Sequence, residues 1–256
     1  MVQQTYHARV IVLHKTKLGE TDLILTFLAE DGSQIRAVAK GARKPSSPFA
    51  SRLELYSQAR VLFACGRSLD IVKEAQIIES NASVRKDFEH VVAAAPLAEL
   101  LDKITQQELS NPQLFPLTQV CLSALGHLES SLAPSITAAH LLKSVSFSGF
   151  RPSLSRCAVC GVPVAYDALG ALTAVSYREG GVVCSDCAPH VDTRLVPTQT
   201  CKWAQVLLYA TIEEIAEMRI DPRTSLAIIQ FCHPWIEEHV GSSLKSLTYL
   251  SDCGLF

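Results

Sequence analysis

The sequence predicts an α+β protein, with an N-terminal OB-fold β-barrel followed by an α-helical domain that carries an inserted four-cysteine module. Three observations support this fold class. Apolar and polar residues alternate over the first 80 residues, apolar residues recur with helical spacing from Ser83 onward, and two C-x-x-C pairs interrupt the helical pattern. The expected domain boundaries are 1–80 for the barrel, 81–150 and 196–256 for the two parts of the helical domain, and 151–195 for the cysteine module.

Five strands are expected in the N-terminal region. They cover residues 8–13, 22–29, 34–40, 53–63 and 70–78, with turns at 30–33 and 65–68. In the third strand, Ile35, Ala37 and Ala39 share one face, while Arg36 and Lys40 lie on the other. Five short strands without a long helix are typical of a small closed barrel of the OB type, a scaffold that often binds single-stranded nucleic acid. An SH3-like barrel would give nearly the same pattern.

Helical spacing governs the rest of the chain outside the cysteine module. Apolar stripes are expected at 88–95, 97–104, 114–125, 138–145, 203–210 and 229–236. Pro96 is expected to kink or restart the first of these helices, because proline lacks a backbone N–H. The last stripe is expected to end near Gly241.

Two cysteine pairs carry the clearest chemical signal. Cys157 and Cys160 form the first pair, and Cys184 and Cys187 form the second, 23 residues further along the chain. Such spacing can place four thiolates around one Zn²⁺ ion, so a single structural zinc is expected in this zinc-binding module. A pair of disulfides, an iron–sulfur cluster or four ordinary buried thiols are the alternatives, and the sequence does not separate zinc from iron.

Composition indicates a reducing compartment. The chain has nine cysteines, an odd number, and five of them lie outside the two pairs. The N-terminus shows no signal-peptide pattern, and no apolar run is long enough for a membrane span. A cytoplasmic, nucleoid-associated protein without a membrane partner is expected.

The charges are unevenly distributed. Residues 1–80 hold 11 Lys and Arg against 8 Asp and Glu, a balance of +3, whereas the whole chain has a net charge of −2. Cations along one strand and its adjoining loops are what a phosphate backbone requires. The candidate DNA-binding residues are Arg36, Lys40, Arg43 and Lys44, with Lys15, Lys17 and Arg52 as further members if the neighbouring loops fold alongside. The alternative is an ordinary solvated outer face of the barrel.

An enzyme is the rival class. His127 and Glu129 followed by Cys157 and Cys160 superficially match the zinc-deaminase pattern of H-x-E and P-C-x-x-C. However, Arg156 stands where that pattern has proline, and a second cysteine pair would close the metal shell that a catalytic zinc keeps open. The sequence also has no phosphate-binding loop of the G-x-x-x-x-G-K-[ST] kind, so nucleotide-driven work is not expected.

Several segments resemble the RecO family of bacterial DNA-repair proteins. They are 8–13, Gly19-Glu20-Thr21-Asp22, Val38-Ala39-Lys40-Gly41-Ala42-Arg43, Gly149-Phe150-Arg151-Pro152, Gly180-Gly181 and the closing 239–247. The resemblance spans nearly the whole chain in the same order. Residues 85–145 match only as helices.

The resemblance implies a DNA repair and recombination mediator of the RecF pathway, with no catalytic activity. RecO-like proteins bind single- and double-stranded DNA, anneal complementary strands and, with RecR, help load RecA onto strands coated by single-stranded DNA-binding protein. Arg36 and Lys40 match the basic strand of the family. The acidic, apolar tail of the single-strand binder docks on the helical domain in related proteins, and Lys143, Arg151 and Lys245 are the candidate cations for it here.

One further expectation concerns the charge of the zinc site. Four thiolates around Zn²⁺ carry a formal charge of about −2, which nearby arginines could offset: Arg151, Arg156, Arg178 and Arg194. A zinc-ribbon transcription factor or a protein-binding adaptor would share the metal signature, and DNA binding by the barrel separates these interpretations from the mediator. Oligomeric state and the docking surface for RecR are not readable from the sequence.

Overall fold

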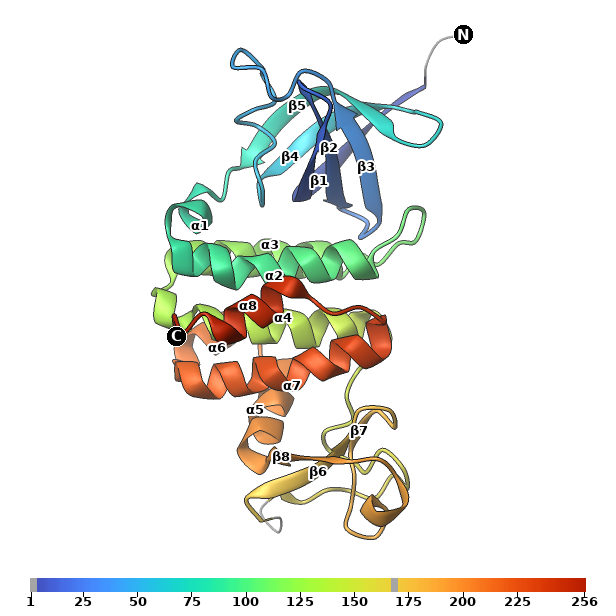
Figure 1. Cartoon of the computed structure of the whole chain (residues 1–256), viewed down its shortest axis with the longest axis vertical. Helices are drawn as coiled ribbons and strands as arrows, with labels where there is room; N and C mark the ends of the chain where they lie inside the picture. The colour runs from blue at the N-terminus through green and yellow to red at the C-terminus, as the bar shows by residue number, and fades with distance from the viewer. Residues whose placement is uncertain (1–3, 167–169) are drawn as a thin grey trace. The chain divides into compact units, whose positions relative to one another are not determined.

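The computed structural model describes residues 4–166 and 170–256 (Figure 1). The chain forms two compact units, Met1–Gly126 and His127–Phe256. The first unit contains the β-barrel and three helices. The second contains the remaining helices and the cysteine module. The domain boundaries expected at residues 80, 150 and 195 stay predictions.

The N-terminal strands close into a five-stranded barrel, which confirms the predicted fold class. The strands are β1 (Thr5–Leu18), β2 (Asp22–Ala29), β3 (Gln34–Ala39), β4 (Gln58–Ala64) and β5 (Asp70–Glu79). Their order around the barrel is β1-β2-β3-β5-β4. Neighbours are antiparallel except β3 and β5, which run parallel. This is the order of an OB-type barrel.

Inward-facing residues of all five strands form the barrel core. Phe27 and Phe63 are fully buried, and their rings meet edge to face with centroids 5.6 Å apart. Ala37 and Ala39 of β3 are also fully buried, so the alternation predicted for this strand is confirmed. Each fully buried large apolar side chain contributes about 1.5–3 kcal/mol, and this core fixes which strand residues face outward.

Two strands differ from their predicted bounds by more than one residue. β1 is longer than the expected 8–13, because a register shift between Val12 and His14 lets its second half continue the pairing with β2. β4 begins at Gln58 rather than residue 53. Tyr56 has φ of 68°, a left-handed conformation that interrupts an extended strand, and Asn81 Nδ2 donates to its carbonyl oxygen at 2.8 Å.

Helices α1 (Ala82–Lys86), α2 (Phe88–Ile104) and α3 (Leu114–His127) complete the first unit. α2 contacts β1 of the barrel. The expected restart at Pro96 is wrong, since α2 continues through this buried residue. Phe88, which is expected on the apolar stripe, is instead 58% exposed in the first turn of α2.

The second unit is built around α4 (Ala133–Phe147), which contacts α5 (Thr198–Tyr209), α6 (Ile212–Met218) and α7 (Pro222–Val240). η1 (Ser130–Leu132) precedes α4, and α8 (Lys245–Asp252) contacts α7. α7 ends at Gly241, as predicted, with this residue in a left-handed conformation. Ile229, Cys232, Trp235 and Ile236 are buried on α7, which confirms the predicted stripe.

The cysteine module interrupts the helices between α4 and α5, as predicted. It contains a three-stranded sheet in the order β7-β6-β8, formed by β6 (Leu172–Ser176), β7 (Gly181–Val182) and β8 (Arg194–Pro197), with η3 (Ala188–His190) between β7 and β8 in the chain. Trp235 Nε1 of α7 donates to the carbonyl oxygen of Phe150 at 2.9 Å, which fixes the chain at the entrance to the module.

Candidate nucleic-acid face and four-cysteine centre

Two cations project from the outer face of β3. Arg36 pairs in register with Thr26 of β2, and Arg36 is exposed between the inward-facing Ile35 and Ala37. Lys40 follows β3 immediately and is also exposed. Four residues of extended chain separate the two side chains by about 13 Å. Among residues 4–166 and 170–256, neither has an acidic partner within 4 Å.

The loop after β3 carries Arg43 and Lys44, both exposed. Arg43 Nη1 donates to the carbonyl oxygens of Gly19 at 3.0 Å and Glu20 at 2.8 Å, so its guanidinium bridges to the β1–β2 turn. These acceptors are neutral, and the positive charge of Arg43 therefore remains available. Its side chain also ties the two turns at this end of the barrel together.

One carboxylate lies within this basic group. The Asp22 side chain accepts from the Gly41 backbone N–H at 2.7 Å and from the Thr21 hydroxyl at 2.9 Å. These hydrogen bonds hold the pKa of Asp22 below its usual range, and the charges of Lys40 and Lys44 lower it further. Asp22 thus offsets part of the positive charge of this group. Because the charges of Lys40 and Lys44 both lower its pKa, these two lysines lie near one carboxylate.

The other three predicted cations lie elsewhere on the barrel. Lys15 and Lys17 pair in register with Leu25 and Leu23, so they belong to the opposite face of the sheet from Arg36. Lys15 Nζ is also 2.9 Å from Glu54 Oε2. Arg52 Nη1 donates to the carbonyl oxygen of Ala75 on β5 at 3.1 Å. The structure therefore places Lys40, Arg43 and Lys44 around Asp22 and the β1–β2 turn, with Arg36 further along β3. It does not place Lys15, Lys17 or Arg52 with them.

Two further outward cations are not among the residues predicted from the sequence. Arg60 lies on β4 between the buried Ala59 and Val61, and Lys73 lies on β5 next to the buried Val72. The alternation of small or apolar residues around Arg60 is a signal that identifies it as outward-facing. The outward position of Lys73 is harder to predict from the sequence, because register shifts interrupt the pairing of β5 with β4.

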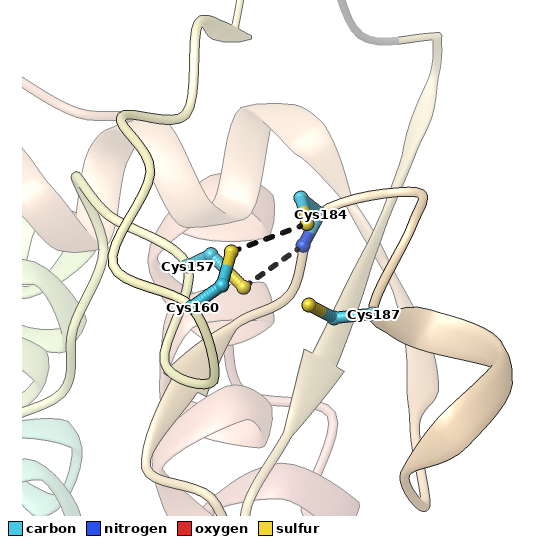
Figure 2. Close-up of side chains that lie close together, drawn as sticks. All are labelled: Cys157, Cys160, Cys184 and Cys187. Carbon is cyan, nitrogen blue, oxygen red and sulfur yellow. Dashed lines mark hydrogen bonds between the residues drawn. The ribbon is translucent and has the colours of Figure 1, made fainter.

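The four paired cysteines converge in the second unit, each pair from its own loop (Figure 2). In the first loop, the Cys157 N–H donates to Val162 O at 2.8 Å and the Gly161 N–H donates to Cys157 O at 2.9 Å. Gly161 has φ of 77°, a conformation that glycine adopts without strain. In the second loop, Cys184 O accepts from the backbone N–H groups of Cys187 and Ala188. Both loops are therefore tight turns that aim two sulfurs in one direction.

The sulfur positions fit a tetrahedral metal site. All four Sγ atoms lie within 4.8 Å of one another, and Cys160 Sγ is 3.7 Å from Cys184 Sγ (Figure 2). A Zn–S bond of about 2.3 Å places tetrahedral sulfurs about 3.8 Å apart, whereas a disulfide would need about 2.05 Å. Cys157, Cys160, Cys184 and Cys187 form no disulfide. The four cysteines can hold one metal ion, and the donor set suits Zn²⁺ as well as iron.

Protonation differs sharply among these thiols. Burial would raise the pKa of Cys157, but backbone N–H groups of Cys160, Cys184 and Val159 donate to its sulfur and lower the pKa to about 6. Hydrogen bonding with Cys184 and Cys160 raises the pKa of Cys187 to about 12. Four thiolates at this separation repel one another, and a bound divalent cation would remove that penalty.

Three of the four arginines expected near the metal each contact a different group. Arg156 Nη1 donates to Gly161 O at 3.0 Å and so stabilises the first cysteine turn. Arg194 lies over the Tyr177 ring at 5.8 Å, and Arg151 lies over the Tyr209 ring at 4.7 Å. Arg178 lies at the turn between β6 and β7.

The residues of the deaminase pattern do not join the cysteines. Over the described parts of the chain, the four cysteines are the only cluster of three or more potential metal-binding side chains. Glu129 Oε1 instead pairs with Arg219 Nη2 at 3.4 Å. The second pair supplies the third and fourth ligands, so the shell has no position for the open site of a catalytic zinc. No helix within the described ranges has the length and apolarity needed to cross a bilayer.

Comparisons with known proteins cover almost the whole chain. Residues 1–81 match the family model described as "Recombination protein O N terminal", and residues 85–248 match "Recombination protein O C terminal". The chain is 31% identical to the DNA repair protein RecO of Roseiflexus sp. (strain RS-1) over 255 residues, which cover 98% of this chain and 87% of the relative. It is 32% identical to the protein of the same name from Desulfitobacterium hafniense (strain DSM 10664 / DCB-2) over 246 residues, covering 94% and 87%. The Frankia casuarinae protein of that name is 35% identical over 191 residues, covering 72% and 74%.

Proposed function

Because the chain belongs to the RecO family, we propose that it is a non-catalytic mediator of DNA repair and homologous recombination. It binds single- and double-stranded DNA and anneals complementary strands. With RecR it helps load RecA onto DNA coated by the single-stranded DNA-binding protein. This activity takes place in the cytoplasm at the nucleoid. The curated relatives are named DNA repair proteins, and the basic group on the barrel supports the DNA-binding part of the proposal.

The observation that carries the DNA-binding proposal is the outward position of Arg36 and Lys40 on the barrel, without an ion-pair partner among the described residues. Such cations bind phosphates and release counterions, so binding is nearly independent of base sequence and weakens steeply with salt. Lys44 and Arg43 extend this surface into the following loop. Asp22 limits its charge, which favours a modest intrinsic affinity.

The partner proposal concerns the second unit. Of the three candidate cations for the acidic tail of the single-strand binder, Arg151 has the best surroundings. Its guanidinium lies over the ring of Tyr209, which is 67% exposed, so a cation and an aromatic surface are presented together. Lys143 Nζ donates to Leu208 O at 3.1 Å, and Lys245 is exposed at the start of α8.

We assign one structural Zn²⁺ to Cys157, Cys160, Cys184 and Cys187. The ion would supply a cross-link between two turns, with all coordination positions taken by sulfur. The role of these residues is to hold the module between α4 and α5 in one conformation.

The test is the double substitution Arg36→Ala and Lys40→Ala. We expect the Kd for single-stranded DNA at moderate salt to rise by roughly tenfold or more, because two phosphate contacts are lost. The slope of log K against log salt should fall by about 1.4, which is about 0.7 per lost cation. Fluorescence anisotropy with labelled oligonucleotides measures both quantities.

The matched control is Arg36→Lys with Lys40→Arg, which keeps both charges and should bind nearly as the parent protein does. Thermal unfolding of each variant checks the fold. An unchanged Kd in the alanine variant would remove these residues from the DNA site. A parent protein that neither binds DNA nor anneals complementary strands would favour a protein-binding adaptor.

A further inference from the structure

A second cationic surface lies over β4 and its two neighbouring strands in the barrel. A hollow of about 410 Å³ is formed by β1, β4, β5 and the loop before β4. Its charged lining residues are Arg52, Arg60, Lys73 and Glu74, which leaves two positive charges in excess. His7 and Phe49 also line it.

These cations are not consumed by neighbouring acids. Among the described residues, no ion pair within 4 Å involves Arg52, Arg60 or Lys73. Arg52 is held in place through one hydrogen bond to the neutral Ala75 carbonyl, so its orientation is fixed while its charge remains. The hollow therefore has pre-positioned positive charge, and Glu74 is the one acid among its lining residues.

The barrel order separates Arg60, at the β4 side of this hollow, from Arg36 on β3. Around the ring β1-β2-β3-β5-β4, strand β4 has β5 and β1 as neighbours and lies across from the β2–β3 pair. Ala59 and Val61 of β4 point into the core and are fully buried, so Arg60 between them points outward. Arg60 and Arg36 thus project from strands that are not neighbours in the ring, whereas Lys73 of the hollow lies on β5, which pairs with β3.

The chemistry of the hollow favours a nucleic-acid backbone. Two arginines and a lysine suit phosphates, and the half-buried Phe49 beside them offers an apolar surface for a base. A larger hollow of about 890 Å³ elsewhere on the first unit makes an informative contrast. It is lined by Glu30, Asp31, Asp70 and Glu108 against Arg9 and Arg67, an excess of negative charge that disfavours a polyanion.

We propose that this hollow, with Arg52, Arg60 and Lys73, is a second site for single-stranded nucleic acid, centred on β4 rather than on β3, so that one chain holds two strand segments on its barrel. The proposal deepens the proposed function and rests on it, because it takes DNA as the ligand. It also supplies a physical means by which one chain can hold two strands.

The experiment counts oligonucleotides per chain. The full-length protein is titrated at low salt, well above Kd, with labelled oligo-dT of about eight nucleotides, a length within the range that one OB fold covers. Non-complementary dT avoids annealing. Because the count is per chain, it does not depend on oligomeric state. We expect two oligonucleotides for the parent protein and one for the Arg60→Ala, Lys73→Ala double variant.

Two controls define the result. The variant Arg60→Lys with Lys73→Arg should still bind two oligonucleotides. Removal of two lysines outside the hollow, Lys86→Ala with Lys103→Ala, should also leave two. For the parent protein, the salt slope of the second binding step should exceed that of any residual second step in the alanine variant by about 1.4.

The outcomes separate this inference from the proposal for Arg36 and Lys40. Loss of one oligonucleotide in the Arg60, Lys73 variant supports the second site whatever the Arg36, Lys40 variant does. A parent protein that binds only one oligonucleotide overturns the second site, as does an Arg60, Lys73 variant that still binds two. Thermal unfolding of each variant excludes misfolding as the cause.

Discussion

His140 of α4 is a histidine without access to solvent. Its side chain is fully buried, and its Nδ1 lies 3.4 Å from Ser144 Oγ on the next turn. Burial lowers the pKa of His140 from 6.5 to about 3, because the charged imidazolium would lose its hydration. The ring is therefore neutral in the folded protein at neutral and mildly acidic pH.

This burial predicts acid sensitivity of the second unit. The unfolded chain takes up a proton at His140 below pH 6.5, whereas the folded chain does not until about pH 3. Stability is therefore full above pH 6.5 and is lost as the pH falls between these values, by about 1.4 kcal/mol per pH unit. Both tryptophans of the chain, Trp203 and Trp235, lie in this unit, so urea unfolding followed by tryptophan fluorescence at pH 7 and pH 5 measures the loss.

The control is His140→Gln, which keeps a polar group but does not titrate. The variant can be less stable at pH 7, so the comparison is the change in unfolding free energy between the two pH values. This change should be smaller in the variant by about 2 kcal/mol. Equal changes in both proteins would show that His140 is not the source of the acid sensitivity.

Individual residues are predictable where one pattern determines them. The alternation of β3 is sufficient to place Arg36 and Lys40 outward, and the C-x-x-C spacing identifies all four converging cysteines. The grouping of Lys15 and Lys17 with Arg36 is not predictable, because a register shift in β1 decides their face. Such a shift depends on pairing with β2 and leaves no clear mark in the local sequence.

The bounds of a helix or strand are predictable where the backbone conformation follows the pattern of apolar and turn-forming residues. The bounds of β2 match the expected 22–29, since Gly19 and Gly32 lie in the turns on either side. The start of β4 differs from the prediction because the left-handed backbone at Tyr56 is held by tertiary contacts that a buried aromatic provides. α2 continues through Pro96 because burial of its apolar neighbours outweighs one lost backbone hydrogen bond.

The turn at Gly181 shows how one element positions the metal ligands. Ser153 N donates to Gly180 O, and Val182 N donates to Ser153 O, each at 2.9 Å. A Cβ atom at Gly181 would lie 2.2 Å from Ser153 O, far inside van der Waals contact. The chain leading to Cys157 therefore lies directly against the turn that leads to Cys184.

Gly181→Ala is expected to separate these two segments and weaken metal binding. The purified variant should contain less metal per chain by elemental analysis and should unfold at a lower temperature than the parent protein. Gly170→Ala is the matched control, since a Cβ there meets no atom within 4 Å. Equal metal content in the two variants would show that this close approach does not determine the site.

At the scale of the whole molecule, the two kinds of site belong to different compact units. Both cationic faces lie in Met1–Gly126, and the cysteine centre lies in His127–Phe256. The order of barrel, helices and cysteine module is readable from changes in the periodicity of the sequence. The division at Gly126 is not, because it depends on which helices contact the barrel, and apolar stripes do not specify their partners.

This separation predicts that metal removal and DNA binding are uncoupled. The proposed metal would hold together the module between α4 and α5, so its removal by a strong chelator should disorder that module and lower the stability of the second unit. The cations of the barrel belong to the first unit, which has its own core. The affinity of the full chain for single-stranded DNA and its salt slope should therefore stay unchanged after chelation.

The informative measurement compares DNA binding with annealing on the same chelated sample. Anisotropy gives the affinity, and the rate of pairing of complementary strands coated by the single-strand binder gives the annealing activity. Retained affinity with slower annealing is expected, because the proposed partner surface belongs to the unit that loses its metal. A DNA affinity that falls in proportion to the metal content would contradict the assignment of DNA binding to the first unit alone. It would mean that the cysteine module itself supports the DNA-binding face.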